Sequence, residues 1–192
     1  MQKRRIFIAI NLPTKAKNTL IKHQRKWQDF FIQKGEEDIL NGIRWTIKPN
    51  LHITLLFIGY VTDDETYEIC EKVKEQAKKF NLFLINLNKI ILGPPSRKPR
   101  MIWAQGEKSE KLAQLQSKIQ TTIEGHENKI KPFKPHVTMA RFKPFVLKKL
   151  PEIDEKTSIQ IPVETIEIMQ SNLKRTGAEY SVLESIQLGE TL

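Results

Sequence analysis

The chain has 192 residues, of which 39% are apolar and 28% charged, which is enough apolar material for one packed globular unit. Its 32 Lys and Arg residues against 22 Asp and Glu residues give a net charge of +10, which favours a polyanion as partner, RNA or DNA before an acidic membrane. The single cysteine, Cys70, excludes an intrachain disulfide and a cysteine-based zinc site, and no run of about 18 apolar residues is present to cross a membrane.

The first residues, M-Q-K-R-R-I-F-I-A-I-N-L-P, combine positive charge with an apolar run, as a signal peptide does. Asn11 and Pro13 break that run, however, and it lacks a small-residue cleavage pattern. We therefore predict a first strand over residues 5–12. A reducing cytoplasm is the expected location of the protein.

A helix is predicted after this strand, with Thr14 as its N-cap and its end near residue 33. Its apolar positions recur at helical spacing and give it one apolar face: Ala16, Leu20, Trp27, Phe31. Residues 35–42 are predicted to form a loop, and residues 43–47 a short strand.

The stretch P-N-L-H-I-T-L-L-F-I-G-Y, residues 49–60, is rich in β-branched and aromatic residues and predicts a buried strand. It contains two polar side chains that need a reason, His52 and Thr54. Side chains at i and i+2 leave the same face of a strand, so an imidazole and a hydroxyl stand side by side. A lone H-x-T would most simply be a strand end followed by an ordinary β-former.

The next segment is predicted to alternate helices and strands. Thr62 and Glu65 form a capping box for a helix to about residue 80, whose apolar stripe makes Cys70 a core residue: Tyr67, Cys70, Val73, Ala77. Strands are expected at residues 82–92 and 101–105, and Ser109 caps a helix that ends near Gly125.

Residues 93–100 between those two strands contain three prolines and three positive charges, so they are predicted to form a loop. A basic loop is often only a solvated surface, but it can also follow a phosphate backbone. Arg97 and Arg100 are therefore candidate substrate-binding residues.

The H-x-T pattern occurs a second time. Pro135-His136-Val137-Thr138-Met139 repeats Leu51-His52-Ile53-Thr54-Leu55, and both copies follow a Lys/Pro-rich lead-in. Two of the four histidines fall in these copies, which favours a duplicated half-site over two coincidences. The second copy predicts a strand over residues 136–142 that includes Arg141.

A second basic loop is predicted at 143–151, strands at 159–169 and 180–188, and a turn at Arg175-Thr176-Gly177. Strands and helices mix without strict βαβ alternation, which favours an α+β fold with antiparallel sheets. No linker or low-complexity segment interrupts residues 1–192. We expect a single domain of two lobes around a cleft, with one motif strand from each lobe.

Two facing imidazoles suit general acid–base catalysis, because one can be protonated while the other is neutral near pH 7. Cleavage of a phosphodiester needs both forms, since a nucleophile loses a proton and a leaving oxygen gains one. Thr54 and Thr138 can donate hydrogen bonds to the non-bridging oxygens, and Arg141 adds a positive charge. Arg141 lies at an odd offset from His136, so a bend or a bulge would be needed to bring it inward.

Other chemistries lack their residues. Neither motif has nearby Asp, Glu or Cys to complete a zinc site, so no metal or other cofactor is expected. No G-x-S-x-G elbow and no G-x-x-x-x-G-K phosphate loop occurs, which argues against serine-nucleophile and ATP-dependent chemistry.

Two H-x-T-x motifs about 80 residues apart resemble the 2H phosphoesterase superfamily, and more specifically its RNA 2′,3′-cyclic phosphodiesterases, also called 2′-5′ RNA ligases. The resemblance also includes R-I-F-I-A-I-N-L-P, R-W, R-x-x-P-R-M-I-W-A, P-F-K-P-H-V-T-M-A-R and S-N-L-x-x-x-G-A-E-Y-S-V-L. It implies a bilobal α+β fold with pseudo-twofold symmetry, in which each lobe is a mostly antiparallel sheet with helices outside.

The resemblance further implies a metal-independent enzyme that opens 2′,3′-cyclic phosphate ends of RNA to a 2′-phosphate, and that in several members joins tRNA halves. It implies that His52 is the proton donor and His136 the proton acceptor, while Thr54, Thr138 and Arg141 hold the phosphate. A monomer without membrane attachment is expected. The alternatives are an RNA-binding protein with a degenerate site, and another 2H activity such as ligation, trimming of oligouridylate ends or cleavage of a small cyclic nucleotide.

Overall fold

The computed structural model describes residues 3–126, 133–174 and 177–189. Its strands are β1 (Arg4–Asn11), β2 (Ile43–Trp45), β3 (His52–Val61), β4 (Phe83–Gly93), β5 (Met101–Gly106), β6 (His136–Phe142), β7 (Asp154–Val163), β8 (Thr165–Lys174) and β9 (Gly177–Gln187). Its helices are α1 (Thr14–Gln33), α2 (Glu37–Gly42), α3 (Asp63–Ala77) and α4 (Glu110–Glu124), with the short 3-10 helices η1 (Lys48–Asn50) and η2 (Pro144–Lys148).

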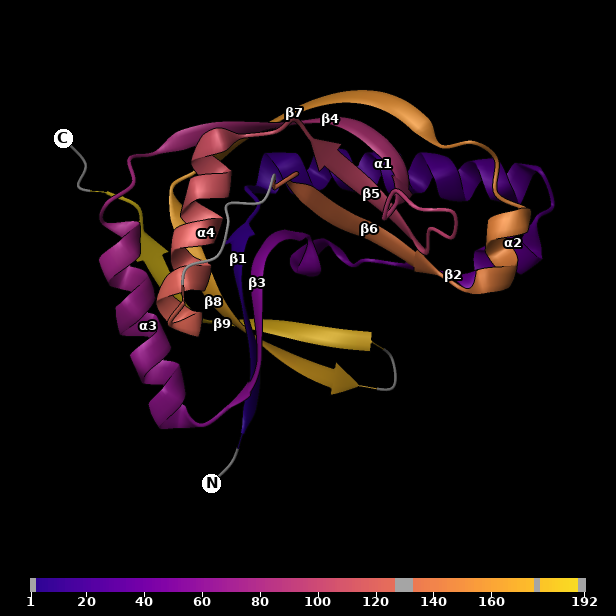
Figure 1. Ribbon diagram of the computed structural model, residues 1–192. Coiled ribbons are helices and arrows are strands. Elements are labelled where there is room, and N and C mark those ends of the chain that lie inside the picture. Colours follow the sequence, from indigo (N-terminus) through magenta and orange to yellow (C-terminus); the bar gives the residue numbers. More distant parts are fainter. Residues whose placement is uncertain (1–2, 127–132, 175–176, 190–192) are drawn as a thin grey trace.

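The strands form two four-stranded halves that meet at the two motif strands (Figure 1). The order is β9-β8-β1-β3 in one half and β7-β4-β5-β6 in the other, and β2 pairs with β6 in addition. In each half the motif strand is innermost, beside the strand that precedes a long helix, β1 before α1 and β5 before α4. The α+β fold with two related antiparallel lobes is therefore confirmed.

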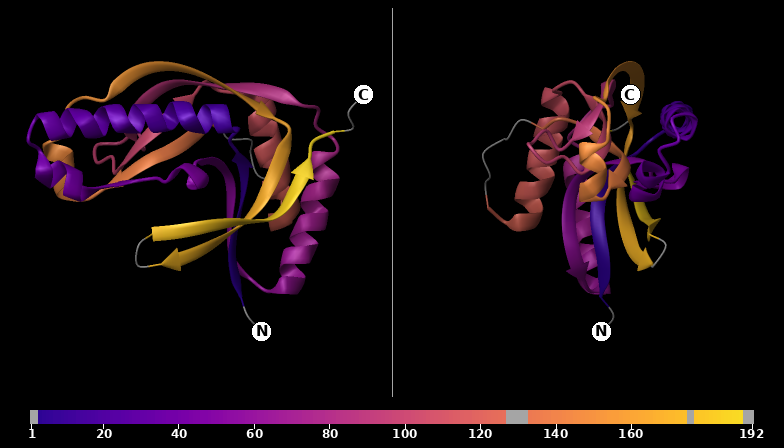
Figure 2. Two further views of the ribbon diagram at one scale, coloured as in Figure 1. Left: turned by 180° about the vertical axis from the view of Figure 1, so that it is seen from behind. Right: turned by 90° about the vertical axis from the view of Figure 1, so that its right-hand side faces the viewer.

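Each of these two helices covers the half to which its own strand does not belong. α1 runs along the second half, where Lys26 bonds Glu155 of β7, and α4 packs against β3 and beside α3 (Figure 2). The apolar faces of the sheet and helices share one large core that contains the innermost residues of both halves, among them Ile53 and Val137. The halves are therefore interlocked by their helices as well as joined by the sheet.

Two predictions about the first helix and the loop after it are wrong. α1 begins at Thr14, but its N-cap is Pro13, and no side chain caps the first turn. Residues 35–42 do not form a loop throughout, because Glu37–Gly42 form α2. The buried side chain of Ile39 anchors this short helix to the core, a tertiary contact that local glycine content does not reveal.

Two predictions made from apolar patterns are also wrong, one about a strand and one about the buried face of α3. The expected strand at 159–169 ends at Val163, and β8 starts at Thr165, because the segment crosses from the edge of one half, beside β4, to the other half, beside β1. On α3 the stripe includes buried Cys70, as predicted, but Tyr67 is 69% exposed and Ile69 is buried instead.

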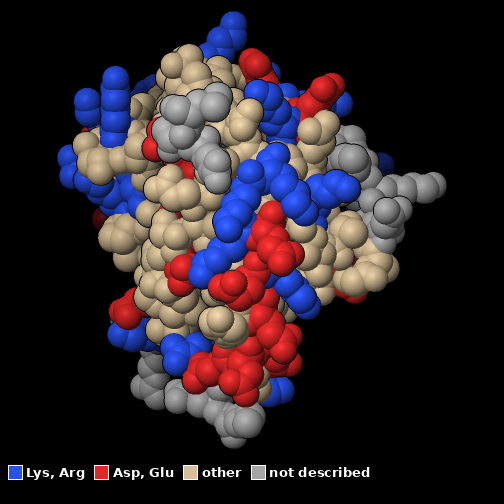
Figure 3. All heavy atoms as spheres, turned by 90° about the vertical axis from the view of Figure 1, so that its left-hand side faces the viewer, with Lys and Arg blue, Asp and Glu red and all other residues tan. Residues whose placement is uncertain are grey.

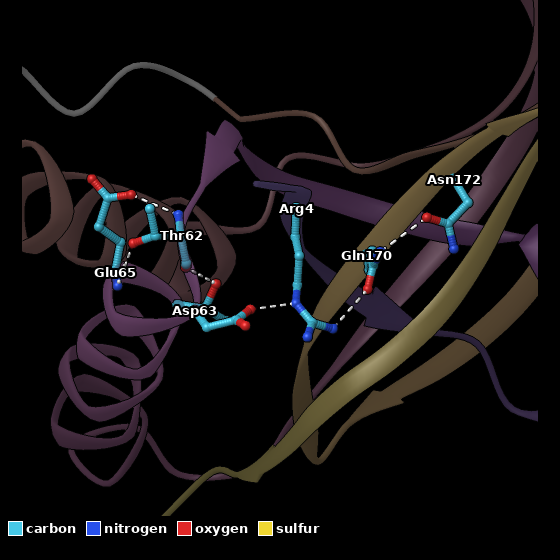
Figure 4. Close-up of polar contacts among 7 residues, drawn as sticks. Arg4, Thr62, Asp63, Glu65, Gln170 and Asn172 are labelled. Carbon is cyan, nitrogen blue, oxygen red and sulfur yellow. Dashed lines mark hydrogen bonds and ion pairs between the residues drawn. The ribbon is translucent and has the colours of Figure 1, made fainter. Parts of the chain in front are cut away.

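The predicted capping box of α3 is confirmed. The Thr62 side chain accepts a hydrogen bond from the Glu65 amide, and the Glu65 carboxylate accepts one from the Thr62 amide (Figure 4). In the same region Arg4 of β1 pairs with Asp63 and donates to Gln170 of β8, which ties the start of α3 to two strands. Of the predicted turn at 175–177, residues 175 and 176 lie outside the described residues.

The charge is distributed unevenly over the surface. α3 carries six acidic and two basic residues, and acidic side chains gather over its N-terminal half (Figure 3). Lys and Arg side chains lie beside them on the same face, so the acidic patch is a local one over the start of α3. No helix in the described part of the chain has the length and apolar character needed to cross a bilayer.

Candidate active site

The two motifs meet through their central residues. Ile53 and Val137 form the only register pair between β3 and β6 among the described residues, and both are fully buried. Since neighbours along a strand leave opposite faces, the His and Thr of each motif project to the other side. There His52, Thr54, His136 and Thr138 line one cavity of about 1130 Å³.

In the first motif, backbone and side chain together fix the orientation of the imidazole. His52 Nδ1 donates to the Asn50 carbonyl at 2.7 Å, and Nε2 lies 3.0 Å from the Thr54 hydroxyl. A carbonyl accepts only, so the neutral ring carries its proton on Nδ1 and directs the Nε2 lone pair to the Thr54 side. Asn50 also donates from its side-chain amide to the Ala178 carbonyl of β9.

The second motif repeats this backbone contact. His136 Nδ1 donates to the Lys134 carbonyl at 3.2 Å, again two residues upstream, so Nε2 is again the ring nitrogen that the backbone leaves available to a ligand. The His136 ring stacks on Trp103 of β5, with ring centroids 4.0 Å apart and an angle of 25° between the planes. The indole has room because Gly93 lies beside it, where an added Cβ would approach the Trp103 ring to 2.2 Å.

A bulge in β6 brings Arg141 to the cavity. Trp103 pairs with Thr138 and Ile102 with Ala140, so Met139 is an extra residue and the alternation of β6 shifts by one. Gln24 of α1 stabilises the bulge, because its buried amide donates to the Met139 carbonyl at 2.8 Å. The odd offset between His136 and Arg141 is compensated in this way, and Arg141 lines the cavity with both motifs.

Three donors of the second half converge on one sulfur atom. Met101 Sδ accepts from Trp103 Nε1 and Arg141 Nη1, each at 3.3 Å, and lies 3.9 Å from the Thr138 hydroxyl. A thioether is a weak acceptor. A phosphate oxygen would bind the Arg141 and Thr138 donors more strongly than the sulfur does.

Burial lowers the pKa of both histidines. For His52 the pKa falls to about 4, first because of desolvation and further because of the nearby charges of Lys17, Arg141 and His136, while the bond to Asn50 opposes the change. The pKa of His136 is lowered by desolvation too, with the Lys134 carbonyl opposing it. Both rings are therefore mainly neutral in the free protein at pH 7, and an anion bound between them would raise both pKa values.

An aromatic wall borders the first histidine. The Phe7 ring lies 5.0 Å from His52 and 5.9 Å from Phe57, and Tyr180 meets His52 edge-on at 5.2 Å. Phe57 is 66% exposed and lines the cavity, because the register shift between Ile8 and Ala9 leaves Leu55 of β3 unpaired and so turns Phe57 to the same face as Thr54. Such a ring offers a stacking surface for a base.

The basic loop before β5, residues 93–100, does not contribute its arginines to the wall of the cavity. Arg97 and Arg100 are exposed, and neither lines the cavity, whereas Met101 immediately after them does. Their substrate contact remains a prediction. The contacts of Trp103, Met101 and Gln24 with the site escaped sequence reasoning, because none of them belongs to a motif whose chemistry is evident.

No group of three or more His, Cys, Asp or Glu side chains within residues 3–126, 133–174 and 177–189 is arranged to hold a metal ion. The site that the described residues form is thus a pair of imidazoles with hydroxyl and guanidinium donors. That arrangement can exchange protons with a substrate and hold an anion between the two halves.

The chain is similar to known proteins in sequence and in fold. A family model described as the 2′-5′ RNA ligase superfamily matches residues 45–175. A protein of Aeropyrum pernix named RNA 2′,3′-cyclic phosphodiesterase is 31% identical over 146 residues, which cover 72% of this chain and 82% of the relative. A Thermotoga maritima protein of the same name is 28% identical over 149 residues, covering 76% of this chain and 80% of the relative.

Among solved structures, the crystal structure of TT0787 from Thermus thermophilus is similar over 97% of this chain and 100% of that one. The TM-score is 0.78 at 27% identity.

Proposed function

The chain belongs to the 2′-5′ RNA ligase superfamily, and from this premise we propose that it hydrolyses the 2′,3′-cyclic phosphate at an RNA end to a 2′-phosphomonoester. The observation that carries the proposal is the pairing of Ile53 with Val137, which directs two His–Thr pairs into one cavity. RNA as the substrate is supported by the net charge of +10 and by the similarity to proteins named RNA 2′,3′-cyclic phosphodiesterase.

In the proposed reaction, water attacks the phosphorus and gives a proton to His136 Nε2. The bond from phosphorus to O3′ breaks, and His52 Nε2–H protonates the departing oxygen. Thr54, Thr138 and Arg141 hold the non-bridging oxygens. The division of roles follows the family resemblance; the lowered pKa of His52 means that this ring must gain its proton with, or after, the arrival of the anionic substrate.

The same site supports joining of two RNA ends, such as tRNA halves, if a 5′-hydroxyl takes the place of water. We propose further that residues 1–192 act as one domain and as a monomer in the cytoplasm. The helices that cross between the halves support the single domain, because neither half has its own complete cover.

The test is a short RNA with a 2′,3′-cyclic phosphate end, incubated in H₂¹⁸O with and without excess EDTA. We expect conversion to the 2′-phosphate with one ¹⁸O incorporated, identified against synthetic 2′- and 3′-phosphate standards, at a rate that the chelator does not change. Binding without conversion would favour the degenerate RNA-binding protein. Turnover confined to a small cyclic nucleotide, or to another RNA end, would favour a different 2H activity.

The motif threonines are expected to matter less than the histidines. A hydrogen bond to a charged oxygen contributes about 1.5–3 kcal/mol, so Thr54→Val or Thr138→Val should lower kcat/KM roughly 10- to 150-fold. Thr54→Ser and Thr138→Ser keep the hydroxyl and are the matched controls. A change below about twofold in the valine variants would reduce both threonines to ordinary strand residues.

The pH dependence follows from the two lowered pKa values. A profile of kcat/KM reports the free protein, so its maximum should lie between those two values and hence below 6.5, the ordinary pKa of a histidine. The kcat profile reports the complex, in which the substrate anion raises both pKa values, so its maximum should lie at higher pH. Initial rates across a pH series test this expectation. A kcat/KM maximum at or above pH 7 contradicts it.

A further inference from the structure

Two arginines lie directly opposite each other beside the active site. β2 pairs with β6 over three residues, Ile43 with Phe142, Arg44 with Arg141 and Trp45 with Ala140. Ile43 and Phe142 are buried, whereas Arg44 and Arg141 are both exposed on the other face. Directly opposed residues of antiparallel strands have Cβ atoms about 5 Å apart, so the two side chains leave the sheet side by side.

Like charges in this arrangement repel unless an anion lies between them. Within the described part of the chain, neither Arg44 nor Arg141 has a carboxylate within ion-pair distance. Both line the active-site cavity and also a second cavity of about 440 Å³, which Lys143 lines as well. No acidic side chain is found among the described residues that line this second cavity. The sheet therefore presents two arginines at one cavity without a neutralising carboxylate, and Lys143, which follows β6 and has its ammonium over the Phe145 ring, lines the same cavity.

This cluster is connected to the place of the reacting phosphate. Arg141 Nη1 and the Thr138 hydroxyl approach the same Met101 sulfur, at 3.3 Å and 3.9 Å, so the Arg141 guanidinium lies close to the second motif. Arg44 lies one strand farther out, because β2 is on the side of β6 away from β5. Positive charge thus extends from the motif threonine outward along the row Arg141, Arg44.

We propose that Arg44, with Lys143 nearby and with Arg141 between it and the reacting phosphate, forms a second phosphate subsite that binds the phosphate on the 5′-oxygen of the terminal nucleotide. The proposal rests on the proposed function and names its substrate class. A strand that ends in a 2′,3′-cyclic phosphate has no nucleotide beyond that end, so any further phosphate of the same strand lies on the 5′ side. The preferred substrate is then an oligonucleotide, or a nucleotide with a 5′-phosphate, and not an unphosphorylated nucleoside cyclic phosphate.

Three substrates separate the sources of that phosphate. Adenosine 2′,3′-cyclic phosphate has none, its 5′-phosphorylated form has a monoester, and the dinucleotide ApA with a cyclic end has a diester. We expect kcat/KM to be roughly 10-fold or more higher for both phosphorylated substrates, as for a charge-assisted pair of hydrogen bonds. The quantity compared is the ratio of kcat/KM between a phosphorylated substrate and adenosine 2′,3′-cyclic phosphate, so a general loss of activity in a variant cancels. If only the dinucleotide gains, the second nucleoside is recognised and the phosphate subsite is wrong.

The variants assign the preference to Arg44. Arg44→Gln should reduce the ratio to near one, and Arg44→Lys should retain part of it, because lysine keeps the charge but not the planar fork. Arg25→Gln is the matched control, since Arg25 is exposed on α1 and lines neither cavity. A ratio near one in the unmodified protein, or an Arg44→Gln variant that keeps the full preference, overturns the proposal.

A binding measurement keeps this test independent of the proposed reaction. Calorimetric titration with adenosine 2′-monophosphate and adenosine 2′,5′-bisphosphate compares the two possible products without turnover. We expect the bisphosphate to bind roughly 10-fold more tightly, and Arg44→Gln to abolish the difference. Absence of turnover with a bisphosphate preference would refute the hydrolysis but support the subsite. Turnover with equal affinity for the two ligands would do the reverse.

Discussion

Replacing either motif histidine by alanine is expected to lower turnover of a 2′,3′-cyclic RNA end by about 10²–10⁴-fold, the usual range for a general acid or base. His52 and His136 face one cavity from two halves of the sheet, and each has its Nδ1 held by a backbone carbonyl. Neither ring can take the other's place, because each backbone contact fixes its own ring. Single-turnover assays of His52→Ala and His136→Ala at saturating substrate measure the loss.

The double variant should lose far less than the product of the two single losses, since the two groups act as one unit. His126→Ala is the matched control, because His126 is an exposed histidine that follows α4 and does not line the cavity. Near-normal activity in either motif variant would remove that histidine from the acid–base pair. Circular dichroism and thermal unfolding of each variant separate lost chemistry from lost fold.

A substrate with a better leaving group is expected to distinguish the roles of the two histidines, which the near-symmetric geometry does not. If His52 is the acid, it protonates O3′ as that oxygen departs. A nitrophenyl phosphodiester has a leaving group that is stable as an anion, so it does not need this proton. His52→Ala should therefore lose little on the nitrophenyl substrate and about 10²–10⁴-fold on the cyclic RNA end, whereas His136→Ala should lose heavily on both.

The assignment of acid and base to the two histidines is open to either order. The family resemblance makes His52 the donor, whereas burial lowers its pKa to about 4 and so favours the neutral ring in the free protein. His136 stacks on Trp103, whose ring face favours a cation. Rescue of His136→Ala by the nitrophenyl substrate would mean that the roles are exchanged. Rescue of neither variant would refute the acid–base division itself.

Interactions could be predicted from the sequence where one short stretch contains both partners. The capping box needs only Thr62 and Glu65, three residues apart, and the repeated H-x-T needs only the alternation of a strand. Predictions failed where the partner was remote in sequence. The chain around Glu164 reads as continuous apolar strand, but its two parts pair with different strands in different halves.

The sequence by itself determined that the protein has two H-x-T half-sites on strands, a basic surface and an α+β fold, because side-chain order and strand periodicity are local properties. Only the tertiary structure decided how these half-sites combine. The Ile53–Val137 pair joins them, the Met139 bulge held by Gln24 turns Arg141 inward, and β2 places Arg44 opposite it. Each of these contacts joins segments far apart in the chain, and register between such segments is set by packing of the whole core and not by local propensity.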